Sequence, residues 1–310
     1  MIDKIAGLCI LILFVLLGEG CSNTGNETGD TYNSGTIHIS CDETFRPVMD
    51  AQVKVFHSQN PEARIIVHYK PEADCLRDLL VDSIRMVIAT RKATREEEQY
   101  VSDSLKTIVS SELVARDLVA VLLNRSSADS FYNMTEIKEL LTGKSKKNLI
   151  PVFDGSSATS TVRFMLDSVL AGEKLSSKVA AASNSLGVID YVSKVPNAVG
   201  FIGYSWIGNE EDTAQLAYRR KLRIAYLEST DSAGHYIQPS QYFIYTQSYP
   251  MVRDLVYILK EGHQGLGSAF GRFLLDMQKG QLIFRRASLM PVKWPNYVRE
   301  VILSENINNQ

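Results

Sequence analysis

Small hydroxyl residues gather between a predicted strand and a predicted helix, in the segment 154–161 (DGSSATST). Their hydroxyls, and the free backbone N–H groups at the start of the helix, can donate hydrogen bonds to one point with the helix dipole behind it. Arg163, early in the same helix, adds a guanidinium whose donors match an oxyanion. The segment therefore predicts a site for a tetrahedral oxyanion, and the alternative is a Ser/Thr-rich helix start without a ligand.

Two further loops carry complementary chemistry. Thr90 and Arg91 follow a predicted strand and supply a hydroxyl and a guanidinium. Two carboxylates and a hydroxyl follow the first predicted strand, those of Asp42, Glu43 and Thr44. Each loop alone has a structural explanation, because Arg91 can pair with a surface carboxylate and acids favour the first turn of a helix. Together they favour one shared ligand site.

The motifs of common enzymes are missing from the sequence. Gly143-Lys144-Ser145 resembles the end of a phosphate loop, but the earlier glycine would fall on Lys138. No GxSxG or SxxK pattern occurs, and no nucleophile stands beside a base. The five histidines are scattered and the four cysteines do not have zinc-ligand spacing. We expect no enzymatic activity, no cofactor and no metal site.

The N-terminus has the pattern of a secretion signal. Lys4 precedes an apolar run over 5–17, which is too short to span a bilayer as a helix. Gly18-Glu19-Gly20-Cys21 then resembles a bacterial lipobox, although its leucine stands one place early, at Leu17. We expect a signal peptide over 1–20, lipidation of Cys21 and a polar tether over 21–34, with an uncleaved membrane anchor as the alternative. The protein would then be lipid-anchored to a bacterial membrane, facing the periplasm or the cell exterior.

Composition indicates an ordinary folded protein. The chain has 310 residues, of which 45% are hydrophobic and 22% charged, and this length suits about two domains. The net charge of -2 argues against nucleic acid as a partner.

Alternating strands and helices must position these loops. Strands are predicted at 36–40, 63–69 and 85–89, with helices from Thr44 and over 71–80 between them. This order favours an α/β fold with a parallel sheet, in which ligands bind beyond the carboxyl ends of the strands. Later elements are predicted as strands at 118–123, 150–153, 199–206 and 241–246, and as helices at 135–141, 162–170, 186–195, 251–260 and 266–279.

An ordered set of motifs resembles a known family. The set runs through CDETF (41–45), IATRKAT (88–94), DLVAVLLN (117–124), LLTGK (140–144), DGSSATST (154–161), PNAVGFIG (196–203), Tyr249-Pro250 with Arg253, Gly280-Gln281 and Leu289-Met290-Pro291. In this order they resemble the substrate-binding lipoproteins of phosphate ABC importers. The resemblance implies a two-lobe type II periplasmic-binding-protein fold, each lobe a mostly parallel sheet flanked by helices. Lobe one would comprise 35–118 and 246–310, and lobe two 119–245.

The resemblance also implies a function. The protein would bind inorganic phosphate between its lobes, deliver it to an ABC permease in the membrane, and act as a monomer. One alternative is a receptor for another oxyanion, such as sulfate or molybdate. The other is a sensor or adhesion protein on the same fold.

Several site residues follow from matching the family's motifs. The Ser-Gly-Thr phosphate loop falls on Thr159, Ser160 and Thr161, with Ser160 in place of the glycine. The hydroxyls after strands three and one fall on Thr90 and Thr44. Where some members have an aspartate that accepts the phosphate proton and so excludes sulfate, this chain has Arg91. Where the family often has an arginine, it has Gly155. We therefore expect Arg163 to replace that arginine, and Asp42 or Glu43 to accept the proton.

Cys41 and Cys75 follow neighbouring predicted strands at one edge of the sheet. In an oxidising compartment they can form a disulfide that braces the loops, and the alternative is two separate buried thiols.

Overall fold

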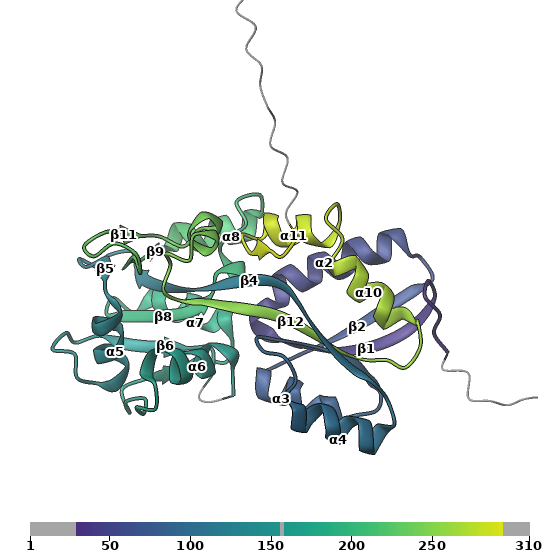
Figure 1. Ribbon diagram of the computed structural model, residues 1–310. Coiled ribbons are helices and arrows are strands. Elements are labelled where there is room, and N and C mark those ends of the chain that lie inside the picture. Colours follow the sequence, from purple (N-terminus) through teal and green to yellow (C-terminus); the bar gives the residue numbers. More distant parts are fainter. Residues whose placement is uncertain (1–28, 156–157, 294–310) are drawn as a thin grey trace, which may run out of the picture.

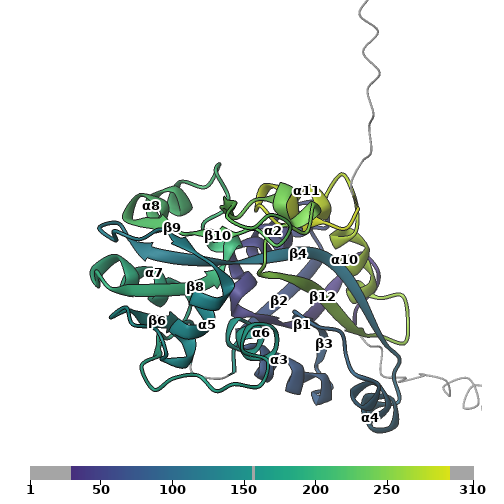
Figure 2. The same cartoon turned by 60° about the vertical axis from the view of Figure 1, so that its left-hand side comes forward.

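A computed structural model of the chain describes residues 29–155 and 158–293, and most of its strands form one long curved sheet (Figure 1). The strand order is β2-β1-β3-β12-β4-β8-β6-β7, with β13 (Met290–Pro291) and β9 (Leu222–Ile224) paired to β4. Helices cover both faces at each end of this sheet, so the molecule has two α/β lobes joined by strands (Figures 1 and 2).

The first lobe is built on parallel strands. β1 (Gly35–Asp42) lies between β2 (Ala63–Lys70) and β3 (Ile84–Ala89), and β12 (Val252–Lys260) runs antiparallel to β3. The helices of this lobe are α2 (Arg46–Gln59), α3 (Glu72–Arg77), α4 (Arg95–Leu105), α10 (Leu266–Leu274) and α11 (Gly280–Arg286). Short 3-10 turns, η1 (Glu43–Phe45) and η2 (Asp78–Leu80), connect them to the strands.

The second lobe repeats this plan on a smaller sheet. β6 (Ile150–Phe153) lies parallel to both β8 (Ala198–Gly203) and β7 (Ala180–Ala181). Its helices are α5 (Met134–Thr142), α6 (Ser160–Phe164) with a π-helical continuation η3 (Met165–Leu170), α7 (Ser185–Lys194), α8 (Thr213–Lys221) and α9 (Gln241–Tyr245). The 3-10 turn η4 (Tyr204–Trp206) follows β8, and a small separate sheet contains β5 (Phe131–Tyr132), β10 (Tyr226–Glu228) and β11 (Tyr236–Ile237).

One strand belongs to both lobes. β4 (Val109–Asn124) pairs with β12 over 109–118 and with β8 over 119–123, antiparallel in both cases. Figure 1 shows β4 and β12 as the long ribbons that cross the middle of the molecule. The hydrophobic cores lie on either side of this crossing. One cluster runs from Leu118 to Met251, while the others draw on residues before 116 and after 254.

The two predictions for residues 241–260 are wrong. Residues 241–245 form helix α9, whose first turn is capped by the Ser240 hydroxyl, and not a strand. Residues 252–260 form strand β12, and not a helix. Because β12 lies between β3 and β4, apolar residues occupy both of its faces, and this obscures the alternation that marks a half-buried strand.

The starts of two predicted helices, at Thr44 and at residue 135, also differ, because neither threonine is the capping residue. Asp42, not Thr44, caps the turn after β1, because its carboxylate accepts the backbone N–H of Thr44 at 3.2 Å. Asn133, not Thr135, caps α5, in a capping box with Glu136. The long helix predicted over 266–279 ends at Leu274.

The folded region begins earlier than Gly35. Asp30 is 7% exposed, and its carboxylate accepts the backbone N–H of Leu266 at 2.9 Å and pairs with Arg85 at 3.3 Å. The first N–H groups of α10 have no partner within the helix, so a carboxylate placed beside them is stabilised. Residues from Asp30 onward therefore belong to the first lobe rather than to the predicted tether. The predicted signal peptide and the predicted lipidation site Cys21 lie outside the described residues.

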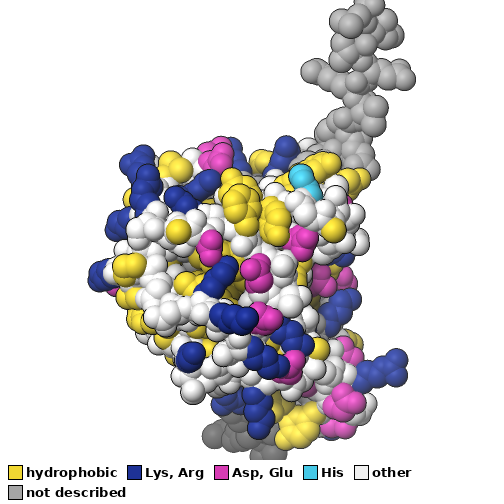
Figure 3. All heavy atoms as spheres, turned by 90° about the vertical axis from the view of Figure 1, so that its left-hand side faces the viewer, with side chains coloured by type: hydrophobic (Ala, Val, Ile, Leu, Met, Phe, Trp, Pro, Cys, Tyr) yellow, Lys and Arg dark blue, Asp and Glu magenta, His cyan; other side chains and the backbone are white. Residues whose placement is uncertain are grey.

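Within the described residues, no helix is long and apolar enough to cross a membrane. The exposed end of the second lobe has basic, acidic and hydrophobic side chains interspersed (Figure 3).

Candidate ligand-binding site

Hydroxyl side chains from both lobes meet where β1 and β6 end. Thr44, in the turn after β1, has its Oγ1 3.4 Å from Oγ of Ser160 at the start of α6. Thr161, next to Ser160, donates from its hydroxyl to Oδ2 of Asp154 at 3.2 Å. Ser185 begins α7, and its Oγ lies 3.4 Å from the same carboxylate oxygen. The sequence therefore predicted Thr44, Ser160 and Thr161 as neighbours correctly, but it did not single out Ser185.

Arg253 is the cation of this hydroxyl cluster. Its Nη1 donates to Ser160 Oγ at 2.9 Å and to Thr161 Oγ1 at 3.3 Å. Its Nε and Nη2 donate to Oδ2 of Asp117 on β4 at 3.1 and 2.8 Å, and both side chains are at most 2% exposed. Burial raises the pKa of Asp117, while Arg253 opposes that rise. The guanidinium is thereby held rigidly beside the hydroxyls.

The site has a tight floor at Gly203, at the end of β8. A Cβ atom there would lie 2.6 Å from Thr44 Cγ2 and 2.8 Å from Arg253 Nη2. Glycine is therefore required for β8 to approach Thr44 and Arg253 this closely.

Two buried carboxylates face the cluster with one oxygen each unsatisfied. Asp42 and Asp154 are 1% and 4% exposed. Among the described residues, no donor reaches Oδ2 of Asp42 or Oδ1 of Asp154. Burial, and then the charge of Glu72, raise the pKa of Asp42 to about 7, and burial raises that of Asp154. The two residues also line a cavity of about 230 Å³ between the lobes.

Glu43 is held more firmly. Its Oε2 accepts hydrogen bonds from the Ser185 hydroxyl at 3.2 Å and backbone N–H at 3.4 Å, and its Oε1 lies 3.9 Å from Nε of Arg46. Burial raises its pKa. Of the two predicted proton acceptors, Asp42 is the one with a free oxygen.

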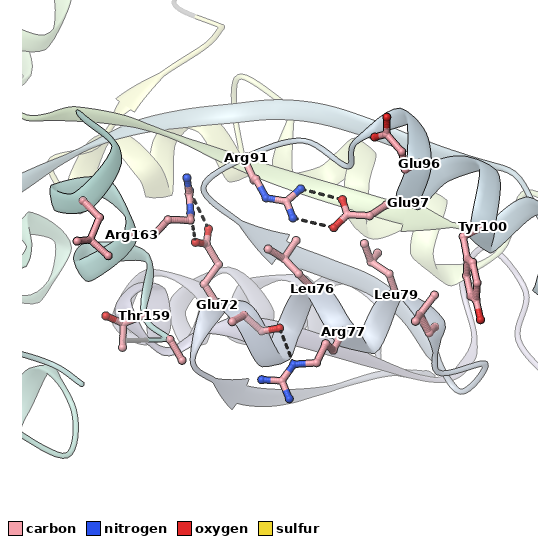
Figure 4. A pocket seen from close by; sticks show the side chains of 14 residues that line it. Glu72, Leu76, Arg77, Leu79, Arg91, Glu96, Glu97, Tyr100, Thr159 and Arg163 are labelled. Atoms are coloured by element: carbon pink, nitrogen blue, oxygen red, sulfur yellow. Dashed lines mark hydrogen bonds and ion pairs between the residues drawn. The ribbon is translucent and has the colours of Figure 1, made fainter. Parts of the chain in front are cut away.

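A second polar cluster bridges the lobes through Glu72 on α3 (Figure 4). Glu72 accepts from Nε of Arg163 at 2.6 Å, and from the N–H and hydroxyl of Thr90 at 2.7 and 2.6 Å. Arg163 also donates to Thr90 Oγ1 at 2.6 Å. Burial acts to raise the pKa of Glu72, but Arg163 and Thr90 hold it below its ordinary value. A backbone hydrogen bond of 3.0 Å from Ala73 to Ala158 ties the lobes at the same place.

Arg163, which was predicted to replace the family's arginine, is bonded to Glu72 and Thr90 in this structure and not to Ser160. Thr90 is likewise bonded within this second cluster. The cluster lines a separate cavity of about 570 Å³, whose floor includes Leu76 and Leu79.

Arg91 lies away from the hydroxyl cluster. Its guanidinium forms a two-pronged pair with Glu97 on α4, at 2.8 and 2.7 Å. This pairing is the structural alternative considered for Arg91, and the structure does not bring Arg91 together with the hydroxyl cluster. Thr159 is used as a helix cap, accepting from the backbone N–H of Val162, and it borders the cavity at Asp42 and Asp154.

Cys41 and Cys75 are both free and fully buried, so the disulfide considered for them is not formed. Cys41 donates to the carbonyl of Asp42 at 3.3 Å and Cys75 to that of Lys70 at 3.6 Å. Burial raises the pKa of each thiol.

Comparison with known proteins identifies the fold family that this two-lobe arrangement defines. The model of the PBP superfamily domain matches residues 26–277, so the chain belongs to the PBP superfamily. Among individual proteins, the chain is similar to the phosphate-binding protein PstS of Bacillus subtilis, with 21% identity over 232 residues that cover 68% of this chain and 74% of PstS.

Solved structures show the same fold. A putative phosphate ABC transporter substrate-binding protein from Clostridium perfringens, with bound phosphate, superposes with a TM-score of 0.69 at 19% identity, covering 84% of this chain and all of that one. An ABC-type phosphate transport receptor from Vibrio cholerae has a TM-score of 0.60 at 15% identity, covering 83% and 100%. These relatives are binding proteins of transporters, not enzymes.

Proposed function

We propose that this chain is an extracytoplasmic receptor that binds inorganic phosphate between its lobes and delivers it to an ABC permease. The observation that carries the proposal is the hydroxyl cluster of Thr44, Ser160, Thr161 and Ser185, contributed by both lobes around Arg253. Hydroxyl donors around a buried guanidinium suit a tetrahedral oxyanion. The phosphate-binding relatives support this ligand, and they do not favour a sulfate or molybdate receptor or a sensor protein.

Each group has a chemical role in this proposal. The hydroxyls and the first backbone N–H groups of α6 donate to the oxyanion, and Arg253 supplies positive charge. Asp42 accepts the proton of the bound phosphate through its free Oδ2. Sulfate carries no proton at neutral pH, so it would leave this carboxylate facing an anion without a hydrogen bond.

Phosphate binding favours closure of the lobes, because the ligand can contact both lobes only in the closed arrangement. We place the lobe boundaries at 118/119 and 245/246. The hydrogen bond from Ala73 to Ala158 and the pair of Glu72 with Arg163 contribute to the same closure.

The N-terminal pattern completes the proposal. The signal peptide over 1–20 is removed, Cys21 is lipidated, and the monomeric receptor stays at the membrane beside its permease. It carries out no reaction.

A thermal-shift titration with phosphate, arsenate, sulfate and molybdate tests the proposal on the full chain in mild detergent. Phosphate at about 100 times its dissociation constant stabilises by roughly 2.7 kcal/mol, which is a rise of several degrees. We expect a rise with phosphate and arsenate only. A rise with sulfate or molybdate would change the substrate, and no rise with any of them would reject the receptor.

A matched pair of variants locates the binding. Ser160→Ala removes a hydroxyl that contacts both Thr44 and Arg253, so the phosphate-dependent rise should shrink. Ser127→Ala removes a hydroxyl that donates to the carbonyl of Asp129 in the turn after β4 and takes no part in this cluster, so it should leave the rise unchanged.

A further inference from the structure

The charges around the hydroxyl cluster do not balance. Arg253 is paired with Asp117, and Arg163 is paired with Glu72, so each guanidinium is already matched by a buried carboxylate. Arg46 and Lys70 also line the cavity at Asp42 and Asp154, and they are paired with Glu43 and Asp78. Asp42 and Asp154 are additional buried carboxylates, and neither forms an ion pair within the described residues. A phosphate ligand would therefore meet more negative charge than the positive charge of the site offsets.

The groups facing these two carboxylates come from every element around the cavity. Asp42 is faced by Glu72 and the Cys75 thiol of α3, Asp154 after β6, Ser160 of α6 and Arg253 of β12. Arg46 of α2 and Lys70 of β2 line the same cavity. Asp154 is faced by Glu43 of η1, Thr159 before α6, Thr161 of α6, Ser185 of α7 and Arg253. Arg253 is the cation common to both sets, and its charge is shared with Asp117.

The free oxygens of these carboxylates determine which ligand fits. Oδ2 of Asp42 and Oδ1 of Asp154 need donors, because an unsatisfied buried acceptor is costly. The hydrogen phosphate dianion offers one O–H, so it would satisfy one carboxylate and repel the other. Dihydrogen phosphate offers two O–H groups and carries one charge less. Each O–H can then form a short, charge-assisted hydrogen bond to one carboxylate.

We infer, on the basis of the proposed function, that the site selects a tetrahedral oxyanion bringing two protons into the complex, with Asp42 and Asp154 as the two acceptors. Dihydrogen phosphate is this ligand, and its arsenate counterpart is equivalent. Because the carboxylates and the ligand titrate as one unit, the complex holds two protons whichever oxygen carries each. Asp154 thereby becomes a specificity-determining residue alongside Asp42.

The pH dependence of phosphate affinity tests this inference on the full chain. Between about pH 7.5 and about pH 9, free phosphate holds one proton, so binding must take up another and the dissociation constant should rise about tenfold for each pH unit. Isothermal titration calorimetry at about pH 8, in two buffers with different ionisation enthalpies, counts that proton directly. We expect uptake of about one proton per phosphate bound.

Variants locate the acceptors. In Asp154→Asn the amide donates to a phosphate oxygen, so the complex needs one proton fewer and the slope with pH should fall to about zero. Asp42→Asn should act in the same way. Asp254→Asn is the matched control, because this half-exposed carboxylate lies on β12 beside Arg253 but pairs outward with Arg116. It should keep the wild-type slope.

The outcomes separate this inference from the proposed function. Phosphate binding with no proton uptake, or with affinity that does not fall with pH, would overturn the inference and leave the phosphate receptor standing. No phosphate binding by the wild-type chain at any of these pH values would overturn both. The calorimetric proton count uses the wild-type chain alone, so it decides the question even where an amide variant fails to fold.

Discussion

Replacing Arg253 by Met should destabilise the protein strongly. The substitution leaves the Asp117 carboxylate buried at 1% side-chain exposure and without its ion-pair partner. Because both partners are enclosed, no solvent screening reduces the effect. Loss of one member of such a pair costs about 3–5 kcal/mol, which corresponds to a fall in Tm of roughly 10 °C for a protein of this size. Urea unfolding followed by tryptophan fluorescence measures the change.

The second partner provides the control. In Asp117→Asn the buried Arg253 charge has already lost its partner, so Arg253→Met added to that background should cost about 1 kcal/mol or less, because removal of an unpaired charge offsets the lost hydrogen bonds to Ser160 and Thr161. The difference between the two backgrounds is the coupling energy of the pair. A loss below about 1 kcal/mol for Arg253→Met alone, or equal losses in both backgrounds, would refute a buried charge pair at the base of the site.

Three further predictions concern other positions. Glu72→Gln removes a carboxylate whose pKa is held below its ordinary value, so the contribution of Glu72 to folding stability is full at neutral pH and is lost as pH falls through the folded-state pKa. The difference in unfolding free energy between this variant and wild type should therefore close below about pH 4, and a difference that stays constant with pH would contradict the pairing. Gly203→Ala should cost about 1–3 kcal/mol and weaken phosphate binding, because its Cβ meets Thr44, whereas Gly262→Ala has its nearest neighbour at 3.8 Å and should cost little on the same urea titration. Cys41 and Cys75 should react slowly with an alkylating reagent in the native protein and fully after unfolding without reductant, which peptide mass spectrometry detects; a disulfide-linked peptide would contradict the free thiols.

Much of the fold can be read from the sequence because local patterns determine it. The apolar strands at 36–40, 63–69, 85–89 and 150–153 are all present as predicted, since each is bounded by polar or turn residues. Residues 241–260 were misassigned because burial on both faces of β12 depends on neighbours more than a hundred residues away. Hydrophobic periodicity carries no information about such partners.

The hydroxyl residues of the site could be predicted from the sequence, but the pairing of its charged residues could not. Ser160 and Thr161 stand in a recognisable segment, and Asp154 opens that same segment, so its position was available although its role was not. Arg253 was noted only within a motif and was placed on a predicted helix. Its function depends on contact with Asp117, 136 positions away in the chain. Arg163 and Arg91 were predicted to contact the ligand, but in the structure they pair with the carboxylates of Glu72 and Glu97.

The position of β12 also constrains the order in which the chain can fold as the ribosome makes it. β12 lies between β3 and β4 in the sheet, yet it is synthesised only after all the strands from β5 to β11. Until residues 252–260 emerge, β3 and the first part of β4 have no partner on the side that β12 will occupy. Unpaired strand edges of this kind are prone to aggregation. The second lobe can therefore complete its core first, and a chain truncated before Val252 would have its first lobe left open.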